Sequence, residues 1–457
     1  MESGGKEYID QYIERAKKAQ YMFKAVSQED TDAAVKAIAK VIYDNAEFLA
    51  ELAVAETGMG NVPDKTLKNR NKAKIIWNSL RGVKSKGVIG RDTETGITKI
   101  AKPIGVVGAV TPTTNPIVTP MSNAMFALKG GNAIVIAPHP RAKGCSGKTV
   151  ELMRAELKKL DFPEDLIQMI PEPTIELTNL LMKAVDVVIA TGGMGMVKAV
   201  YSSGKPALGV GAGNVQAIID RDADITDAVA KITSGRAFDN GIICSGEQTA
   251  IYPAEMRDEI MNEFEKNGAL IVRDAETVDK FRKALFDDDG VISKHAIGQP
   301  VQTIGSLAGV SIPENIKVIV LEAKDYGTRD LLAREKMCPA ITAYAYGDFE
   351  EAVEIAKANL EVEGKGHSVA IHSNNVENIE YAAKELCVSR FVINQSCAGS
   401  AGGSFFNGLS PTNTLGCGSW GNNSISENLT WYHLVNISRV AYYMPENHVP
   451  DDGELWG

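Results

Sequence analysis

One cysteine of this chain lies in a short, glycine-containing segment where a thiol could meet a ligand. Cys244 stands within Arg236-Ala-Phe-Asp-Asn-Gly-Ile-Ile-Cys-Ser-Gly-Glu-Gln-Thr249. A helical pattern over 223–238 precedes it, and a strand-like run over 248–252 follows it. A cysteine on such a connection can be open to a substrate while its neighbours hold it still, so Cys244 is a candidate nucleophile. The alternative is a buried cysteine that packs as a small apolar residue.

A glycine turn marks a second candidate site. The run Val187-Val-Ile-Ala-Thr-Gly-Gly-Met-Gly-Met-Val-Lys198 predicts a strand, a turn and a helix. Such a turn points backbone N–H groups and the positive end of a helix at a phosphate. The residues at this place are Thr191, Gly192, Gly193 and Gly195. The run is not a full GxGxxG, and the alternative is a tight turn that needs glycine only for its backbone dihedrals.

Two other strand ends carry polar side chains. Ile136-Ala-Pro-His-Pro-Arg-Ala-Lys143 supplies His139, Arg141 and Lys143, which either meet an adenosine ribose or its 2′-phosphate or lie in solvent. Gly105-Val-Val-Gly-Ala-Val-Thr-Pro-Thr-Thr-Asn-Pro116 ends in a loop where prolines flank Asn115. A side-chain amide held in this way is a good oxyanion donor. The alternative is an asparagine that only forms a turn.

Composition bounds the class of protein. The 457 residues predict two or three domains, and 44% apolar with 23% charged residues is ordinary for a soluble globular protein. A net charge of −10 argues against nucleic acid or an anionic membrane as the main partner. We find no apolar run of roughly 18 residues and no secretion signal at the start, so we expect a cytoplasmic protein without a membrane span.

Cysteine and histidine spacing argues against a metal site. None of the 6 cysteines forms a CxxC pair, and the 6 histidines are not clustered near them. Scattered cysteines in a large chain without a signal also predict reduced thiols. We expect Cys338, Cys397 and Cys417 to be packing or loop residues, with Cys397 close to a substrate loop.

Hydrophobic patterns predict an α/β fold. Strands that are apolar throughout, separated by helices, indicate parallel sheets covered on both faces. The expected strands are 104–110, 132–137, 166–170, 185–190, 215–219, 248–252, 317–321, 340–345, 368–372 and 391–394. The expected helices are 6–26, 28–57, 65–80, 120–129, 145–160, 175–183, 255–267, 275–286, 328–336, 348–359 and 375–386. We predict two α/β domains in tandem, joined near 213–220.

The remaining segments predict how the domains are bounded and how copies of the chain associate. A polar turn between apolar runs predicts a hairpin over 84–102, whose edges need a neighbouring domain or another subunit. The run 399–423, rich in Gly, Ser and Asn, is long enough to be an active-site loop, and Leu429 to Tyr443 could add a strand to another subunit. The predicted units are a cofactor-binding domain at 1–216 with hairpin 84–102 as an oligomerisation arm, a catalytic domain at 217–428, and a C-terminal oligomerisation segment at 429–457.

These segments together resemble one family. Thr111-Pro-Thr-Thr-Asn-Pro116, Asn240-Gly-Ile-Ile-Cys244 and Glu335-Lys-Met-Cys-Pro339 occur in the order and relative positions found in the aldehyde dehydrogenase superfamily. Three further runs resemble its CoA-acylating branch: Ala137-Pro-His-Pro-Arg141, Gly366-His367 and Leu415-Gly-Cys-Gly-Ser-Trp-Gly-Asn-Asn-Ser-Ile-Ser-Glu427. That branch includes CoA-dependent succinate-semialdehyde dehydrogenases and the aldehyde-oxidising half of bifunctional aldehyde–alcohol dehydrogenases.

The resemblance implies two tandem Rossmann-like domains and a set of residue roles. Cys244 would attack the aldehyde, and the Asn115 amide with the Cys244 N–H would stabilise the oxyanion. Glu335 would bind the nicotinamide ribose, and the turn from Thr191 to Gly195 would bind the pyrophosphate of NAD or NADP. Thr111 and Pro112 belong to the expected cofactor-binding set together with His139 and Arg141. His367 is the candidate for moving the proton of Cys244 or of CoA.

One departure bears on the fate of the thioester. Hydrolytic members of the family carry Glu-Leu-Gly-Gly-Lys, whereas this chain reads Gly209-Val-Gly-Ala-Gly-Asn214, without a carboxylate. A thioester on Cys244 would lack that base, so we expect transfer to CoA as co-substrate. A hydrolytic or phosphate-reducing enzyme on the same fold, or a filament-forming structural protein, are the alternatives.

The substrate is less well defined. The overall resemblance favours succinate semialdehyde, with acetaldehyde and sulfoacetaldehyde as alternatives. The run Asn394-Gln-Ser-Cys-Ala-Gly-Ser-Ala-Gly-Gly403 lacks the paired threonines that we associate with the succinate-semialdehyde subgroup. Arg236 could pair with an anionic tail, or it could be a structural arginine on its helix. We expect a homodimer or homotetramer.

Overall fold

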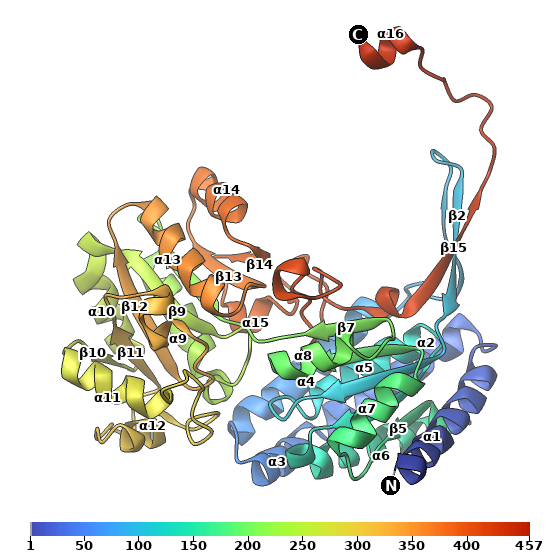
Figure 1. The fold of residues 1–457 in the computed structure, drawn as a ribbon, viewed down its shortest axis with the longest axis horizontal. Coiled ribbons are helices and arrows are strands. Elements are labelled where there is room, and N and C mark those ends of the chain that lie inside the picture. The colour runs from blue at the N-terminus through green and yellow to red at the C-terminus, as the bar shows by residue number, and fades with distance from the viewer. Residues whose placement is uncertain (1) are drawn as a thin grey trace.

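The computed structural model describes residues 2–457 and shows two lobes, each built on its own parallel sheet (Figure 1). The first sheet has the order β5-β4-β3-β6-β7 with every neighbouring pair parallel. Its strands are β3 (Val106–Thr111), β4 (Ala133–Pro138), β5 (Ile167–Met169), β6 (Val187–Thr191) and β7 (Ala207–Val210). Strands β3 and β4 are buried along their whole length, which explains their unbroken apolar sequence.

Helices of the first lobe pack their apolar residues against this sheet. They are α1 (Glu2–Phe23), α2 (Gln28–Asp44), α3 (Ala46–Thr57), α4 (Val62–Leu80), α5 (Val118–Lys129), α6 (Lys143–Lys159), α7 (Ile175–Ala184) and α8 (Met194–Tyr201). The prediction of one helix over 28–57 was wrong, because Asn45 separates α2 from α3. Its side-chain amide donates to the Val41 carbonyl at the end of α2.

The second sheet has the order β10-β11-β12-β9-β8-β13-β14, again parallel throughout. Its strands are β8 (Val215–Ile219), β9 (Glu247–Pro253), β10 (Ala269–Val272), β11 (Val318–Glu322), β12 (Ala340–Tyr346), β13 (Gly366–His372) and β14 (Val388–Ile393). The helices of this lobe are α9 (Ile225–Ala237), α10 (Arg257–Lys266), α11 (Ala275–Leu285), α12 (Val301–Leu307), α13 (Phe349–Val362), α14 (Val376–Glu385) and α15 (Cys397–Ser400). The two sheets confirm the predicted pair of α/β units.

The predicted helix at 328–336 was wrong. Only two short turns occur there, η5 (Gly327–Arg329) and η6 (Leu331–Ala333). Gly327 has a left-handed backbone with φ of 64°, and Asp330 between the turns is extended. The Asp330 carboxylate accepts hydrogen bonds from Leu332 N and from the Arg282 guanidinium, which holds the chain in this non-helical path.

The predicted hairpin is present and gains a third strand from the same chain. Strand β2 (Ile97–Pro103) pairs with β1 (Gly87–Asp92) on one side and with β15 (Val435–Ala441) on the other, both antiparallel. Strand β15 is an edge of this sheet, so the expectation that the C-terminal segment adds a strand to another subunit stays a prediction. In Figure 1 this sheet rises away from the lobes, and the chain continues past it to α16 (Asp452–Trp456).

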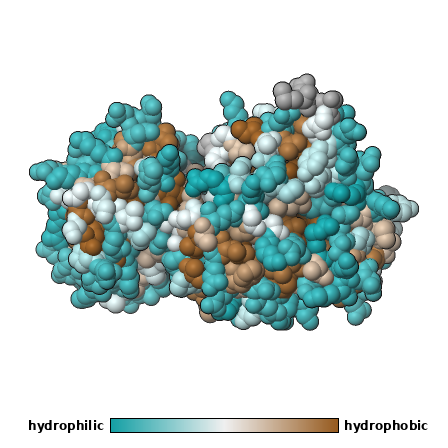
Figure 2. Space-filling model, turned by 90° about the horizontal axis from the view of Figure 1, so that it is seen from below, coloured by the Kyte–Doolittle hydropathy of each residue, from teal (hydrophilic) through white to brown (hydrophobic). Residues whose placement is uncertain are grey.

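The boundary between the lobes falls between the two sheets. The predicted boundary after residue 216 lies inside β8, and the division into three units stays a prediction. Leu429 and Leu434 pack into the core of the first lobe, so the chain returns there before it forms β15. Seen from below, the surface is largely hydrophilic and is hollowed between the lobes (Figure 2). Within residues 2–457 no helix is long and apolar enough to cross a membrane.

Candidate active site

A cavity of about 770 Å³ lies where the carboxyl ends of β3, β4, β6 and β7 face the second lobe. This is the edge of a parallel sheet at which ligands usually bind. Residues predicted for the site form much of its wall: Thr111, Pro112, Asn115, His139, Thr191, Gly192, Gly193, Gly195, Cys244, Glu335 and His367. Of the residues assigned to the site above, Arg141 lies outside this lining and is exposed in the turn after His139. Its role stays a prediction.

The glycine turn offers open backbone to the cavity. Strand β6 ends at Thr191, and Gly193 is the N-cap of α8. A Cβ atom at Gly193 or Gly195 would meet no heavy atom within 4 Å, so there is free space beside both. Backbone N–H groups at the start of α8 can therefore approach a phosphate closely. The residues present fit the pyrophosphate of a dinucleotide.

The distal part of the cavity lies next to the start of α7. Pro138 and His139 follow β4, and Pro173 and Ile175 face the same space from the segment that opens α7. Partial burial of its ring, together with the nearby Arg141, lowers the pKa of His139, although much of the residue is exposed. Lys143 is paired with Glu172 at 2.5 Å and lies outside the cavity lining.

The segment before Cys244 is tightly wound. Asp239, Asn240 and Gly241 have φ of 52°, 51° and 72°, so three successive residues adopt the left-handed region. Arg236 holds this segment in place, since its guanidinium donates to the carbonyl oxygens of Gly241 and Glu247. Arg236 is fully buried and lies outside the cavity lining. This position favours a structural role for the arginine and does not support a contact with an anionic tail of the substrate.

Cys244 is half-buried at the cavity wall. Burial, with the nearby Glu335 carboxylate, raises the pKa of its thiol to about 12. Two cations oppose this effect, the guanidinium of Arg390 and the ammonium of Lys72. Because the thiolate is the nucleophile, these positive charges favour the reactive form.

His367 lines the cavity and is neutral. Burial, together with the positive charge of Arg390, lowers the pKa of its imidazole to about 3. Its Nδ1 atom has no hydrogen-bond partner among the described residues, so a ligand can form a hydrogen bond there. A Cβ atom placed on Gly213 would lie 3.3 Å from His367 Cε1 and 2.0 Å from the Cys244 carbonyl oxygen. Both residues therefore stand against the same glycine.

Asn115 reaches the cavity from the loop after β3. Lys68 on α4 donates to its Oδ1 atom at 2.8 Å. With Oδ1 occupied by the ammonium, the Nδ2 group is left free to donate elsewhere, apart from a 3.4 Å contact with Thr114 Oγ1. An amide fixed in this way can donate to a substrate oxygen.

Glu335 lines the cavity and lies close enough to Cys244 for its charge to act on the thiol. Burial, with Glu363 nearby, raises the pKa of its carboxyl to about 8. Its backbone N–H donates to Glu363 Oε2 at 2.9 Å, which fixes the chain at this point. A carboxyl group beside the glycine wall fits the hydroxyl groups of a ribose.

The segment 209–214 passes directly beside Cys244 without presenting an acid. Gly211 and Ala212 line the cavity, and Gly213 packs against the Cys244 carbonyl. The sequence of this segment contains no carboxylate that could activate water. Its closeness supports the expectation that water lacks a base there.

Three charged residues near the site were not found from the sequence. Lys68 and Lys72 stand one turn apart on α4, and Arg390 lies on β14 with only 2% of its surface exposed. Lys72 donates to the carbonyl oxygens of Gly402 and Thr412 at 3.0 and 3.1 Å. Burial lowers the pKa of Lys72 to about 8. A run of lysines on an amphipathic helix gives no signal that two of them turn inward.

Cys338, Cys397 and Cys417 are buried, in agreement with the packing role expected for them. Asn413 and Leu415 line the cavity, so the run 399–423 does reach it.

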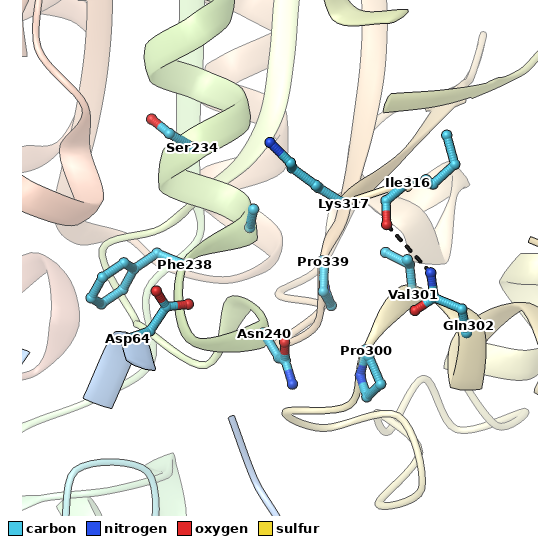
Figure 3. A pocket seen from close by; sticks show the side chains of 11 residues that line it. Asp64, Ser234, Phe238, Asn240, Pro300, Val301, Gln302, Ile316, Lys317 and Pro339 are labelled. Atoms are coloured by element: carbon cyan, nitrogen blue, oxygen red, sulfur yellow. Dashed lines mark hydrogen bonds between the residues drawn. The ribbon is translucent and has the colours of Figure 1, made fainter. Parts of the chain in front are cut away.

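A second, smaller pocket of about 440 Å³ lies beside the segment that carries Asn240, and none of the predicted site residues lines it (Figure 3). We find no cluster of three or more metal-binding side chains within residues 2–457.

Comparison with known proteins agrees with this geometry. The model of the aldehyde dehydrogenase family matches residues 1–279. This chain belongs to the aldehyde dehydrogenase family. It is 55% identical to the acetylating succinate-semialdehyde dehydrogenase of Clostridium kluyveri, over 98% of this chain and 99% of that protein. It is 42% identical to a sulfoacetaldehyde dehydrogenase of an Acholeplasma species, over 98% and 93%.

Solved structures of acylating members share the fold. An acetylating aldehyde dehydrogenase from Geobacillus thermoglucosidasius has a TM-score of 0.93 and 37% identity, over 99% of both chains. The propionaldehyde dehydrogenase of Rhodopseudomonas palustris, solved with propionyl-CoA bound, has a TM-score of 0.85 and 30% identity, over 95% and 94%. An engineered glycolyl-CoA reductase with bound NADP⁺ has a TM-score of 0.84 and 29% identity, over 95% and 97%. The aldehyde dehydrogenases that are similar to this chain therefore include acylating enzymes.

Proposed function

We propose that this aldehyde dehydrogenase oxidises a short aldehyde with a nicotinamide dinucleotide and passes the acyl group from Cys244 to CoA. The observation that carries the proposal is the shared cavity of Cys244, Asn115, His367 and the glycine turn, with no acid in 209–214. The bound propionyl-CoA of a relative supports CoA as the acyl acceptor. The reaction is reversible. In the acyl-transfer step the Cys244 thioester is exchanged for a CoA thioester, which is a bond of the same kind.

Each side chain has one role in this proposal. The Cys244 thiolate attacks the aldehyde carbon, and the carbonyl electron pair moves to oxygen. The amide of Asn115 and the N–H of Cys244 stabilise that oxyanion. His367, which has a free Nδ1 atom, is the group that we propose to accept the proton of Cys244 or of CoA, although its pKa of about 3 makes it a weak base before substrates bind. The CoA thiolate then attacks the thioester carbonyl and releases Cys244 as the leaving group.

The dinucleotide would lie along the cavity wall formed by the first sheet. Thr191 to Gly195 would hold its pyrophosphate, Glu335 its nicotinamide ribose, and Thr111, Pro112 and His139 would complete the wall. When bound, this group supplies the acceptor for the hydride that leaves the aldehyde carbon. NAD and NADP both stay open, since His139 lines the cavity while Arg141 and Lys143 do not.

Succinate semialdehyde is the substrate that we propose. The relative with 55% identity acts on it by name, and Lys72 adds a physical reason. Lys72 carries a positive charge that influences Cys244, and no acidic side chain within residues 2–457 pairs with it. This ammonium lies outside the cavity lining, so it favours a negatively charged substrate through its longer-range field rather than by direct contact. The sulfonate of sulfoacetaldehyde is the alternative anion, whereas acetaldehyde brings none.

Association into a homodimer or homotetramer in the cytoplasm completes the proposal. The three-stranded sheet and the chain beyond it expose apolar side chains: Val88, Val440, Tyr442, Tyr443, Val449 and Trp456. Strands β1 and β15 form its two open edges. Exposed apolar groups and open strand edges on a projecting element fit the surface of a second copy.

The test is an assay of reduced dinucleotide formed from succinate semialdehyde, sulfoacetaldehyde and acetaldehyde, each with and without CoA. We expect turnover to require CoA and to be fastest with succinate semialdehyde. In a Lys72→Met variant, we expect kcat to fall with every aldehyde, because a charge that favours the Cys244 thiolate is lost, and the KM to rise about two- to threefold for succinate semialdehyde but not for acetaldehyde. Equal turnover without CoA would refute the acyl-transfer proposal.

A further inference from the structure

Lys68 connects two parts of the active site that are far apart in the sequence. Its Nζ atom donates to Asn115 Oδ1 at 2.8 Å and to Asp239 Oδ2 at 2.5 Å. Asn115 belongs to the loop after β3, and Asp239 stands five residues before Cys244 in the tightly wound segment. One ammonium thus contacts both the proposed oxyanion donor and the segment that carries the nucleophile.

Asp239 is built into this position from several sides. Its side chain is fully buried, and Lys65 donates to the same Oδ2 atom at 3.0 Å. Its Oδ1 atom accepts from Asn61 N at 3.1 Å, and its own N–H donates to Asp64 Oδ2 at 2.8 Å. Figure 3 shows Asp64, at the start of α4, next to Phe238 of the wound segment. The start of α4 and the segment 238–244 therefore form one rigid unit.

We propose that Lys68 is a positioning residue that orients the Asn115 amide toward the aldehyde oxygen, with Asp239 tying it to the Cys244 segment. The proposal rests on the role of Asn115 given above. Because the ammonium occupies Oδ1, the amide cannot rotate its oxygen toward the substrate, and Nδ2 is presented instead. The positive charge also polarises the amide, which strengthens Nδ2 as a donor to an oxygen that becomes negative.

Lys65 is a matched comparison within the same cluster. It shares the Asp239 carboxylate with Lys68 and is equally buried, with 4% and 8% of the side chains exposed. The hydrogen bonds of Asn115 include Lys68 but not Lys65. If the two lysines served only to neutralise Asp239, their removal would have similar effects on catalysis.

The test is a double-mutant cycle on the full chain with CoA and dinucleotide present. We expect Lys68→Met to lower kcat roughly 10- to 100-fold, with the KM for aldehyde changed less than about threefold. In the Asn115→Ala background the same change should cost less than about threefold, because there is no amide left to orient. Lys65→Met should leave kcat within about threefold of the wild type.

The outcomes separate the inference from the proposed role of Asn115. If Asn115→Ala alone leaves kcat unchanged, the role of Asn115 as oxyanion donor fails. If Asn115→Ala slows the reaction and Lys68→Met costs the same factor in both backgrounds, the inference about Lys68 is overturned. Equal losses in Lys65→Met and Lys68→Met would also overturn it. Should Lys68→Met lower the melting temperature so far that it does not fold, Lys68→Gln, which keeps a donor for Asn115 Oδ1, is expected to retain more kcat than Lys68→Ala.

Discussion

The two walls of the cavity are built by different means. The cofactor wall is largely backbone and glycine at the ends of parallel strands, with Gly193 and Gly195 facing open space. The nucleophile wall is made of side chains that are fixed by buried charges, as Lys68 fixes Asn115 and Arg236 fixes the segment before Cys244. The first wall depends on short local sequence, whereas the second depends on contacts between distant segments. Substitutions in the cofactor wall should therefore change dinucleotide binding, whereas substitutions in the nucleophile wall should change the rate of the chemical step.

Removing the nucleophile should have the largest effect. Cys244→Ala is expected to lower CoA-dependent turnover by roughly 10⁴-fold or more, because no thioester can form without the thiol. Binding of the dinucleotide, measured by fluorescence titration, should be almost unchanged, since the glycine wall is intact. Turnover near that of the wild type would remove Cys244 from the mechanism.

A pair of glycines gives the most direct comparison of the walls. An alanine Cβ at 213 would lie 2.0 Å from the Cys244 carbonyl oxygen, so Gly213→Ala must displace the nucleophile. We expect kcat to fall roughly 10²-fold, since a shift of about 1 Å at reacting atoms has this effect. Gly193→Ala meets no atom within 4 Å and has φ of −66°. It should raise the KM for the dinucleotide and leave kcat within about twofold.

Thermal unfolding and iodoacetamide labelling are the controls for this pair. Both variants should melt within a few degrees of the wild type if the displacement at 213 stays local. Labelling of Cys244 should slow in Gly213→Ala and not in Gly193→Ala. The same loss of kcat in both variants would show that the two walls are not separable.

The local parts of the molecule could be predicted from the sequence. Strands such as 133–138 are apolar throughout, and a glycine turn follows 187–191. The hydrophobic pattern and the glycines at the strand ends are therefore enough to identify these elements. The cavity lining contains the predicted set around Cys244, although the role of each residue stays a prediction. Strands β7 and β10 were missed because four residues leave little pattern to detect.

The charge network could not be predicted in the same way. Lys68 lies 47 residues from Asn115 and 171 from Asp239, and nothing local distinguishes it from the exposed lysines of other helices. The inward turn of Lys68 follows from the packing of α4 between the lobes rather than from its own sequence. The sequence leaves two roles open for Arg236, and its hydrogen bonds to backbone carbonyl oxygens favour the structural one.

The ionisation of Cys244 tests the electrostatics of the nucleophile wall. Glu335 and Cys417 disfavour its thiolate, Arg390 and Lys72 favour it, and His367 is neutral. Because burial raises the pKa to about 12, the thiolate fraction should grow between pH 6 and 9 without a plateau, by less than about tenfold per unit near pH 8, where Glu335 gains and Lys72 loses its charge. The rate of Cys244 alkylation by iodoacetamide, corrected with Cys244→Ala, should rise accordingly.

Arg390 is the residue to change in this measurement. It is buried, and its guanidinium donates to neutral groups, including the His367 carbonyl oxygen at 2.8 Å and Asn428 Oδ1 at 3.2 Å. Arg390→Gln should slow alkylation roughly tenfold at every pH in this range, which corresponds to about one further unit of pKa. Arg390→Lys should recover part of the rate because it keeps the charge. An identical rate in both variants would indicate that Arg390 supports only the fold.

The smallest effect is expected where the two walls meet. Glu335→Gln keeps the size of the side chain and most of its hydrogen-bonding capacity, so the KM for the dinucleotide should rise only about three- to tenfold. Above the Glu335 pKa of about 8 the variant also removes a negative charge that raises the pKa of Cys244, so alkylation of the thiol should become faster at high pH and be little changed at low pH. Titration of dinucleotide at saturating aldehyde and CoA, beside the alkylation rate, measures both effects in one variant. A rise in KM without faster alkylation would assign Glu335 to the cofactor wall alone. Faster alkylation with an unchanged KM would remove it from the ribose site.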